Sequence, residues 1–158
     1  MAKRTINISK RRHEVRRYVR ELTQNIYNYS SYIASVEVPT IRLAEDGLGT
    51  FYLPSQARFE QLHSDSPAAG IIFQDDAFLT VKEIFCYDYA NDTDAEPQIV
   101  RPEFSYHYQN PHRQFFFRYD HHPQIGDVAT HPRYHLHVGC WRPGDTKLPI
   151  TPLFACQR

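Results

Sequence analysis

The stretch FSYHYQNPHRQFFFRYD, residues 104–120, has the clearest structural signal in the chain. Aromatic residues alternate with polar ones before the tetrapeptide 110–113, and aromatic residues dominate again after it. Alternation with a period of two is typical of β-strands that bury one face, and a link of this length is ordinary for a hairpin loop. The sequence therefore predicts two antiparallel strands, Gln98–Gln109 and Gln114–Asp120.

Further segments with a β pattern lie on both sides of this hairpin. The chain contains 11 Tyr and 10 Phe, and such aromatic residues suit the pleated surface of a sheet. Pro39 interrupts the first of these segments, which is typical of an edge strand or a bulge. The predicted strands are Val36–Leu43, Thr50–Leu53, Ile71–Phe73, Phe78–Tyr89 and Arg133–Val138, and a short helix is expected at Gln56–His63.

The segment before these strands has a helical period. Its apolar residues are spaced four or three apart and form one stripe: Val15, Val19, Leu22, Ile26, Tyr29 and Ile33. Ser9 is the expected N-cap, and no Pro or Gly interrupts the segment up to Ala34. The sequence predicts one α+β domain over residues 1–158. In it, an amphipathic N-terminal helix, residues 9–34, packs on a twisted antiparallel β-sheet formed by the mainly β remainder, residues 36–158.

Charge is unevenly distributed along the chain, although the formal net charge is zero. Basic side chains are concentrated near the N-terminus, off the apolar stripe of the predicted helix. A basic helix face can bind a phosphate backbone or an acidic protein, and it can equally be a solvated surface without a partner. The residues predicted to bind nucleic acid are Arg11, Arg12, Arg16, Arg17 and Arg20.

Cysteine usage and the N-terminal segment indicate the compartment. The three cysteines show no CxxC spacing, which favours reduced thiols over a disulfide framework. The opening segment MAKRTINISKRR has no apolar core of the kind that a secretory signal needs. No apolar run approaches the roughly 20 residues that cross a bilayer. The sequence therefore predicts a soluble cytoplasmic protein without membrane contact.

Alternation along the strands also predicts which polar side chains meet. If the aromatic side chains of residues 104–120 and the apolar ones of Arg133–Val138 face one core, the intervening polar side chains share the opposite face. The candidate site on that face consists of His107, Arg118, Asp120, His135 and His137.

These residue types supply the parts for cleaving a phosphodiester bond. A histidine with a pKa near the ordinary value of about 6.5 can take a proton from a ribose 2′-hydroxyl or give one to a leaving oxygen. An arginine can hold a phosphate bidentately and stabilise the charge that grows in the transition state. We therefore predict that His135 and His137 act as acid and base and that Arg118 clamps the phosphate. Asp120 and His107 would orient these groups, and no cofactor is required.

Two other interpretations fit the same region. The pair His135 and His137 can ligate a divalent ion, with further ligands from Asp120, His121, His122 or His131. We expect no tightly bound metal, because the spacing matches no ordered metal motif and Arg118 and Arg133 would repel a cation. In the other interpretation, the histidines are ordinary exposed residues on the surface of the sheet.

Four blocks occur in order along the second half of the chain: Tyr106–Gln109, Phe117–Asp120, His121–Pro123 and His135–Gly139. In this order of blocks the sequence resembles the TumE-like family of small bacterial and archaeal toxin components. It is also similar to other uncharacterised bacterial families with RYD and HLH blocks. The likeness covers about the last third of the chain. His121 stands where the family usually has Asn, and the region from Met1 to Pro97 does not visibly match.

The resemblance implies a toxin-like protein of bacteria that acts on RNA and is neutralised by a partner encoded beside it. Combined with the candidate site, this leads to our first hypothesis, a metal-independent ribonuclease. The alternative is a noncatalytic module of a toxin–antitoxin or defence complex, which binds nucleic acid or protein through the basic helix. The sequence leaves open whether the protein is an enzyme.

Overall fold

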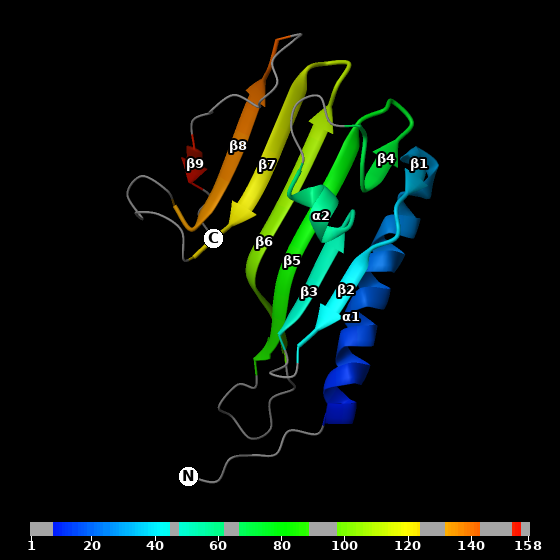
Figure 1. The fold of residues 1–158 in the computed structure, drawn as a ribbon, viewed down its shortest axis with the longest axis vertical. Helices are drawn as coiled ribbons and strands as arrows, with labels where there is room; N and C mark the ends of the chain where they lie inside the picture. The colour runs from blue at the N-terminus through cyan, green and yellow to red at the C-terminus, as the bar shows by residue number, and fades with distance from the viewer. Residues whose placement is uncertain are drawn as a thin grey trace.

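The computed structural model describes residues 8–44, 48–61, 67–88, 98–123, 132–142 and 153–155, and the side chains of residues 8–12, 87–88 and 153–155 lie outside that description. The elements are α1 (Ile8–Asn28), the 3₁₀-helix η1 (Ser30–Tyr32), β1 (Ile33–Val36), β2 (Thr40–Leu43), β3 (Gly49–Leu53), α2 (Gln56–Phe59), β4 (Ile71–Phe73), β5 (Phe78–Asp88), β6 (Gln98–Asn110), β7 (Phe115–His121), β8 (Tyr134–Cys140) and β9 (Leu153–Ala155) (Figure 1). The strands form one antiparallel sheet, so the fold is α+β, as the sequence predicts.

The sheet is organised around β5 and β6, its two longest described strands. They pair antiparallel from Phe78 opposite Gln109 to Asp88 opposite Gln98. On its other edge β5 pairs with β4 near its start and with β3 from Val81 onwards, so that β3 and β4 lie end to end. β1 extends the sheet beyond β4 and β2 beyond β3, while β7, β8 and β9 follow β6 in that order. The predicted hairpin of β6 and β7 is confirmed, but its turn lies at residues 111–114 instead of 110–113, because Asn110 pairs with Phe115 and Gln114 has a positive φ of 52°.

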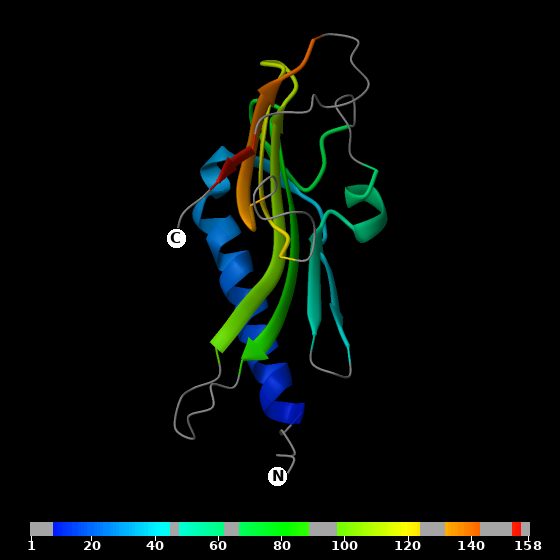
Figure 2. The same ribbon diagram turned by 90° about the vertical axis from the view of Figure 1, so that its left-hand side faces the viewer.

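The helix α1 lies along one face of the sheet, and α2 lies on the opposite side (Figure 2). The main core is the contact between the apolar stripe of α1 and apolar side chains of β3, β4 and β5. It includes Val15, Tyr18, Val19, Leu22 and Ile26 from the helix and Phe51, Leu53, Ile71, Val81 and Phe85 from the sheet. Burying a large apolar side chain contributes about 1.5–3 kcal/mol. The helix–sheet contact is therefore a principal source of stability.

The predicted amphipathic helix is present, but its start differs from the prediction. α1 begins at Ile8, so Ser9 lies inside the first turn and not at the N-cap position expected from the sequence. Val15, the first residue of the predicted stripe, is buried against the sheet. No helix in the described part of the chain combines the length and apolarity that a bilayer crossing needs.

The end of α1 also differs from the sequence prediction. The apolar spacing predicts helix up to Ala34, whereas α1 ends at Asn28 and η1 leads into β1. Ser30 and the serine after it compete with helical hydrogen bonding and favour turns. Ile33, counted in the helical stripe by its spacing, instead pairs with Phe73 of β4. Pairing across the sheet overrides the local period at this point, and it suits a β-branched side chain.

Two further segments differ from the sequence prediction. The sequence predicts one interrupted strand over Val36–Leu43, and the structure divides it into β1 and β2. Pro39 lies between them and has no N–H for a ladder, which explains the break. The short helix predicted at Gln56–His63 ends at Phe59, and residues 62–66 lie outside the described residues.

One carboxylate is buried under α1. Glu83 of β5 is 1% exposed and accepts hydrogen bonds from the hydroxyls of Tyr18 on α1 and Tyr106 on β6. The guanidinium of Arg101 lies 3.7 Å from the same carboxylate. Burial, followed by the interactions with Glu83, raises the pKa of both tyrosines, so both remain protonated donors. This network joins the helix to the two central strands.

Candidate functional site

The candidate site lies on the face of β6, β7 and β8 that is turned away from α1. Strand pairing puts Arg118 opposite both His107 and His137, and Asp120 opposite His135. The alternating neighbours of these residues face the helix side, where Tyr106 packs against the core. The five residues predicted from alternation therefore share one face of the sheet.

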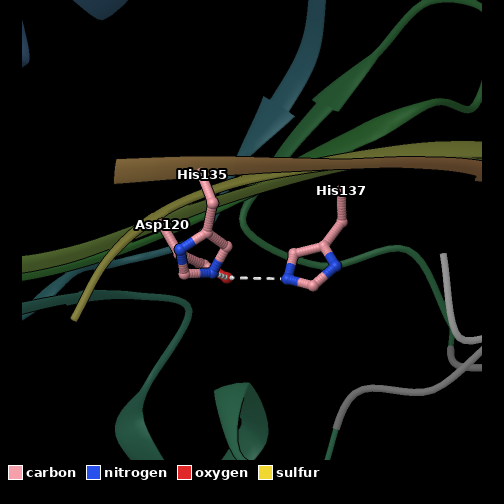
Figure 3. A group of neighbouring side chains, drawn as sticks. All are labelled: Asp120, His135 and His137. Carbon is pink, nitrogen blue, oxygen red and sulfur yellow. Dashed lines mark ion pairs between the residues drawn. The ribbon is translucent and has the colours of Figure 1, made fainter. Parts of the chain in front are cut away.

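Asp120 is the centre of this group, and the two imidazoles of β8 converge on it (Figure 3). Its carboxylate is fully buried, and Oδ2 lies 3.5 Å from His135 Nε2 and 3.7 Å from His137 Nε2. The same oxygen accepts a hydrogen bond of 2.6 Å from Arg118 Nε. A buried carboxylate is costly unless it is paired and hydrogen-bonded, and the guanidinium supplies both interactions.

Hydrogen bonds define which ring nitrogen of each histidine is available for chemistry. His135 Nδ1 lies 2.7 Å from the carbonyl oxygen of Pro132, so Nδ1–H donates and Nε2 is directed at Asp120. His137 Nε2 lies 3.2 Å from Arg118 Nη2, which can only donate. His137 Nε2 therefore carries a lone pair, and this nitrogen can accept a proton.

The site residues differ in their access to solvent. The His135 and Asp120 side chains are 0% exposed, whereas those of Arg118 and His137 are 42% and 17% exposed. A substrate that approaches this face can reach Arg118 and His137 directly. The prediction that His135 transfers protons to and from substrate meets a physical obstacle, because its ring lies behind the accessible groups.

His107 has a different environment from the other predicted site residues. Its Nε2 lies 3.2 Å from Gln109 Oε1, and its ring stacks on Phe116 with centroids 6.0 Å apart. Burial, as the largest cause, lowers the pKa of His107 to about 4, so the ring is neutral at physiological pH. Its position opposite Arg118 and beside Phe116 suits a packing role in the floor of the site.

Three further polar residues belong to the same face. His122 Nε2 lies 3.9 Å from Asp120 Oδ1, and its Nδ1 lies 3.4 Å from Glu103 Oε1, which also pairs with Lys82. The His122 side chain is 18% exposed, and burial lowers its pKa despite the two carboxylates nearby. Alternation already indicates His122, two residues beyond Asp120, but the predicted strand ended too early to include it.

The positions of these side chains also decide which residues could ligate a metal ion. Asp120, His135 and His137 each offer one ligand atom, and the three atoms lie within 4.8 Å of one another. His121 stacks on Tyr134 on the other face, with ring centroids 4.0 Å apart, so it cannot join that set. His131 lies outside the described residues.

The interpretation of the histidines as exposed surface residues fits some of them and not others. The His112 side chain at the β6–β7 turn is 69% exposed and pairs with Asp76. His107 and His135 are buried, so for these two the interpretation is wrong.

The basic residues of α1 are separate from this cluster. Arg16, Arg17 and Arg20 are exposed, and Arg17 pairs with Glu14 at 2.8 Å and with Glu21 at 3.8 Å. The side chains of the other two predicted nucleic-acid-binding residues, Arg11 and Arg12, lie outside the described residues.

Comparison with known proteins identifies one family. The TumE family, described as Toxin TumE, matches residues 52–152, while no curated protein and no solved structure matches the chain. The match begins well before the last third of the chain, so the resemblance is more extensive than the sequence blocks predict. The matched region contains the whole cluster around Asp120 and none of α1. The chain belongs to the TumE toxin family.

Proposed function

We propose that this toxin-family protein is a metal-independent ribonuclease whose reaction centre is the group around Asp120. The observation that carries the proposal is the contact of Arg118 with both Asp120, at 2.6 Å, and His137, at 3.2 Å. It places an accessible guanidinium beside an imidazole that can accept a proton. An anion-binding group and a base at adjacent positions are what phosphodiester cleavage requires.

The reaction can be assigned to atoms of these residues. The Arg118 guanidinium holds a non-bridging phosphate oxygen, and His137 Nε2 takes the proton from the ribose 2′-hydroxyl. The 2′-oxygen then bonds to phosphorus, and the bond from phosphorus to the 5′-oxygen breaks. The leaving oxygen takes a proton from a second, protonated imidazole. The products are a 2′,3′-cyclic phosphate and a 5′-hydroxyl, so protons and bonds balance.

The second imidazole in this proposal is His122. It is partly exposed and its Nε2 lies 3.9 Å from Asp120 Oδ1, whereas His135 is fully buried. A lowered pKa makes the protonated form of His122 a stronger acid, although it is a minor form at neutral pH. His135, held by the Pro132 carbonyl, then acts as a positioning residue for Asp120.

The direct test is incubation of tag-free protein with single-stranded and structured RNA. We expect cleavage products that end in a 2′,3′-cyclic phosphate, detected by mass spectrometry. DNA of the same sequence should remain intact, because it lacks the 2′-hydroxyl. Cleavage that survives unchanged in both the His135→Ala and the His137→Ala variants would contradict the proposed site.

Metal independence is a separate prediction. Arg118 already supplies a cation at the cluster, so protein purified without a histidine tag should contain well below one transition-metal ion per chain, and cleavage should persist in EDTA. Elemental analysis and activity after chelation check both statements. A full equivalent of zinc or nickel that EDTA removes together with the activity would overturn the acid–base mechanism.

The exposed arginines of α1 support a second role, that of holding the RNA backbone. Arg16 and Arg20 lie one helical turn apart and are exposed, while Arg17 is partly neutralised by its glutamates. In the double variant Arg16→Glu/Arg20→Glu, RNA binding should weaken and the slope of log affinity against log salt should fall by about 1–2. Fluorescence anisotropy at several salt concentrations measures the slope. An unchanged slope would remove α1 from the RNA interface.

Membership of a toxin family also supports a neutralising protein partner, which we propose as an antitoxin. Co-purification of the chain with the product of the neighbouring gene is the simplest test. If the two proteins do not associate, and if cells that make both are not protected, this part of the proposal fails.

A further inference from the structure

We propose that Asp120, His135 and His137 form a latent site for a divalent transition-metal ion, and that Arg118 occupies the cation position when no metal is bound. The three candidate ligand atoms come from two adjacent strands and lie within 4.8 Å of one another. Imidazole and carboxylate ligands of this kind suit Zn²⁺ and Ni²⁺. The binding part of this inference does not depend on the proposed ribonuclease activity.

Two of the three spacings between the ligand atoms are close to those of a tetrahedral site, and the third is within 4.8 Å. Bonds of about 2.0–2.1 Å to Zn²⁺ put tetrahedral ligand atoms about 3.3 Å apart. Asp120 Oδ2 lies 3.5 Å from His135 Nε2 and 3.7 Å from His137 Nε2. Small side-chain movements would therefore suffice to close three ligands around an ion. A fourth position would remain for water.

The surroundings of the ligands also match a metal site. His135 donates its other ring N–H to the carbonyl of Pro132, and ligating histidines are commonly oriented by such a bond. Asp120 Oδ1 is buried and has no hydrogen-bond partner among the described residues, which leaves this carboxylate under-satisfied by Arg118 alone. A divalent ion would compensate the buried charge more completely.

Arg118 is the feature that makes the site latent. Its Nε and Nη2 contact Asp120 and His137, two of the three ligands. Its side chain is 42% exposed, so it can turn toward solvent. Two cations a few ångströms apart repel each other strongly, so metal and guanidinium are alternative occupants. Metal binding would then withdraw both the phosphate clamp and the base of the proposed reaction, and Zn²⁺ would inhibit cleavage.

The test is competition for Zn²⁺ between tag-free protein and a chromophoric chelator. The Arg118→Gln variant should bind Zn²⁺ at least about tenfold more tightly than the unmodified protein, because the competing cation is removed. Arg113→Gln is the matched control: it removes the same charge at the exposed β6–β7 turn. It should leave the affinity unchanged. Equal affinities of unmodified protein and Arg118→Gln would overturn the proposal.

Substitutions of the proposed metal-ligating residues provide a second test. His137→Ala should abolish the tight class of Zn²⁺ binding, and Asp120→Asn should do the same if His137→Ala does not fold. The control is His112→Ala, which removes an exposed histidine that also pairs with an aspartate, Asp76, at 3.0 Å. It should retain tight binding. Tight Zn²⁺ binding that survives in folded His137→Ala and Asp120→Asn would contradict the site, whatever the nuclease assay shows.

Discussion

Replacement of His137 by Gln is expected to slow RNA cleavage by about 10²–10⁴-fold, the usual contribution of a general acid or base. Glutamine can still accept the hydrogen bond that Arg118 Nη2 gives to His137 Nε2 at 3.2 Å. It cannot take a proton from the ribose hydroxyl. The variant therefore separates proton transfer from the positioning of the guanidinium. The rate at saturating RNA should fall, while the affinity for RNA should change little.

Two controls make this result specific. His112→Gln alters an exposed histidine at the β6–β7 turn, away from the cluster, and should cleave RNA at the normal rate. Thermal unfolding of both variants shows whether the fold is intact, and the His137 side chain is accessible enough to tolerate replacement. If folded His137→Gln cleaves RNA as fast as the unmodified protein, His137 is not the base.

Period-two alternation along the strands predicts which residues share the face of the candidate site. Residues two apart on a strand share a face, and a hairpin sets which residues of its strands lie opposite each other. These two rules are sufficient to put His107, Arg118 and Asp120 on the same face, but the expected loop 110–113 would pair His107 with Phe116. The observed turn begins one residue later, and it brings His107 opposite Arg118. The two rules do not place β8, because its pairing with β7 follows a segment that no hairpin rule covers. The convergence of His135 and His137 on Asp120 depends on that pairing.

Burial of the site could not be predicted in the same way. Alternation says on which side of a sheet a residue lies, but it does not say what covers that side. His135 was expected to reach substrate and is fully buried, whereas His122 lay beyond the predicted strand and is accessible. The end of α1 could not be predicted either, because it also depends on a contact between distant parts of the chain. Ile33 fits the helical spacing, yet its pairing with Phe73, forty residues away in the chain, places it in a strand.

His107 is expected to make the fold sensitive to acid. Its pKa is lowered to about 4 in the folded protein, mainly by burial, against an ordinary value of about 6.5 in the unfolded chain. The unfolded chain therefore takes up the proton first as the pH falls. The stability contributed by neutral His107 is complete above about pH 6.5 and is lost progressively down to about pH 4. Between pH 7 and pH 4.5 the free energy of unfolding should fall by about 2 kcal/mol from this residue alone.

Urea unfolding at pH 7.0, 5.5 and 4.5 measures this loss, and His107→Gln assigns it. Glutamine keeps a donor for Gln109 Oε1, which lies 3.2 Å from His107 Nε2, but it has no proton to gain in this range. The variant should be less stable than the unmodified protein at pH 7, because the stacking on Phe116 is lost. The further decrease in its free energy of unfolding toward pH 4.5 should be smaller by about 2 kcal/mol.

The lowered pKa of His122 acts in the same direction, so some acid sensitivity should remain in His107→Gln. His112→Gln removes an exposed histidine and should retain the full decrease. An equal decrease in His107→Gln would mean that the protonation of another group controls acid unfolding.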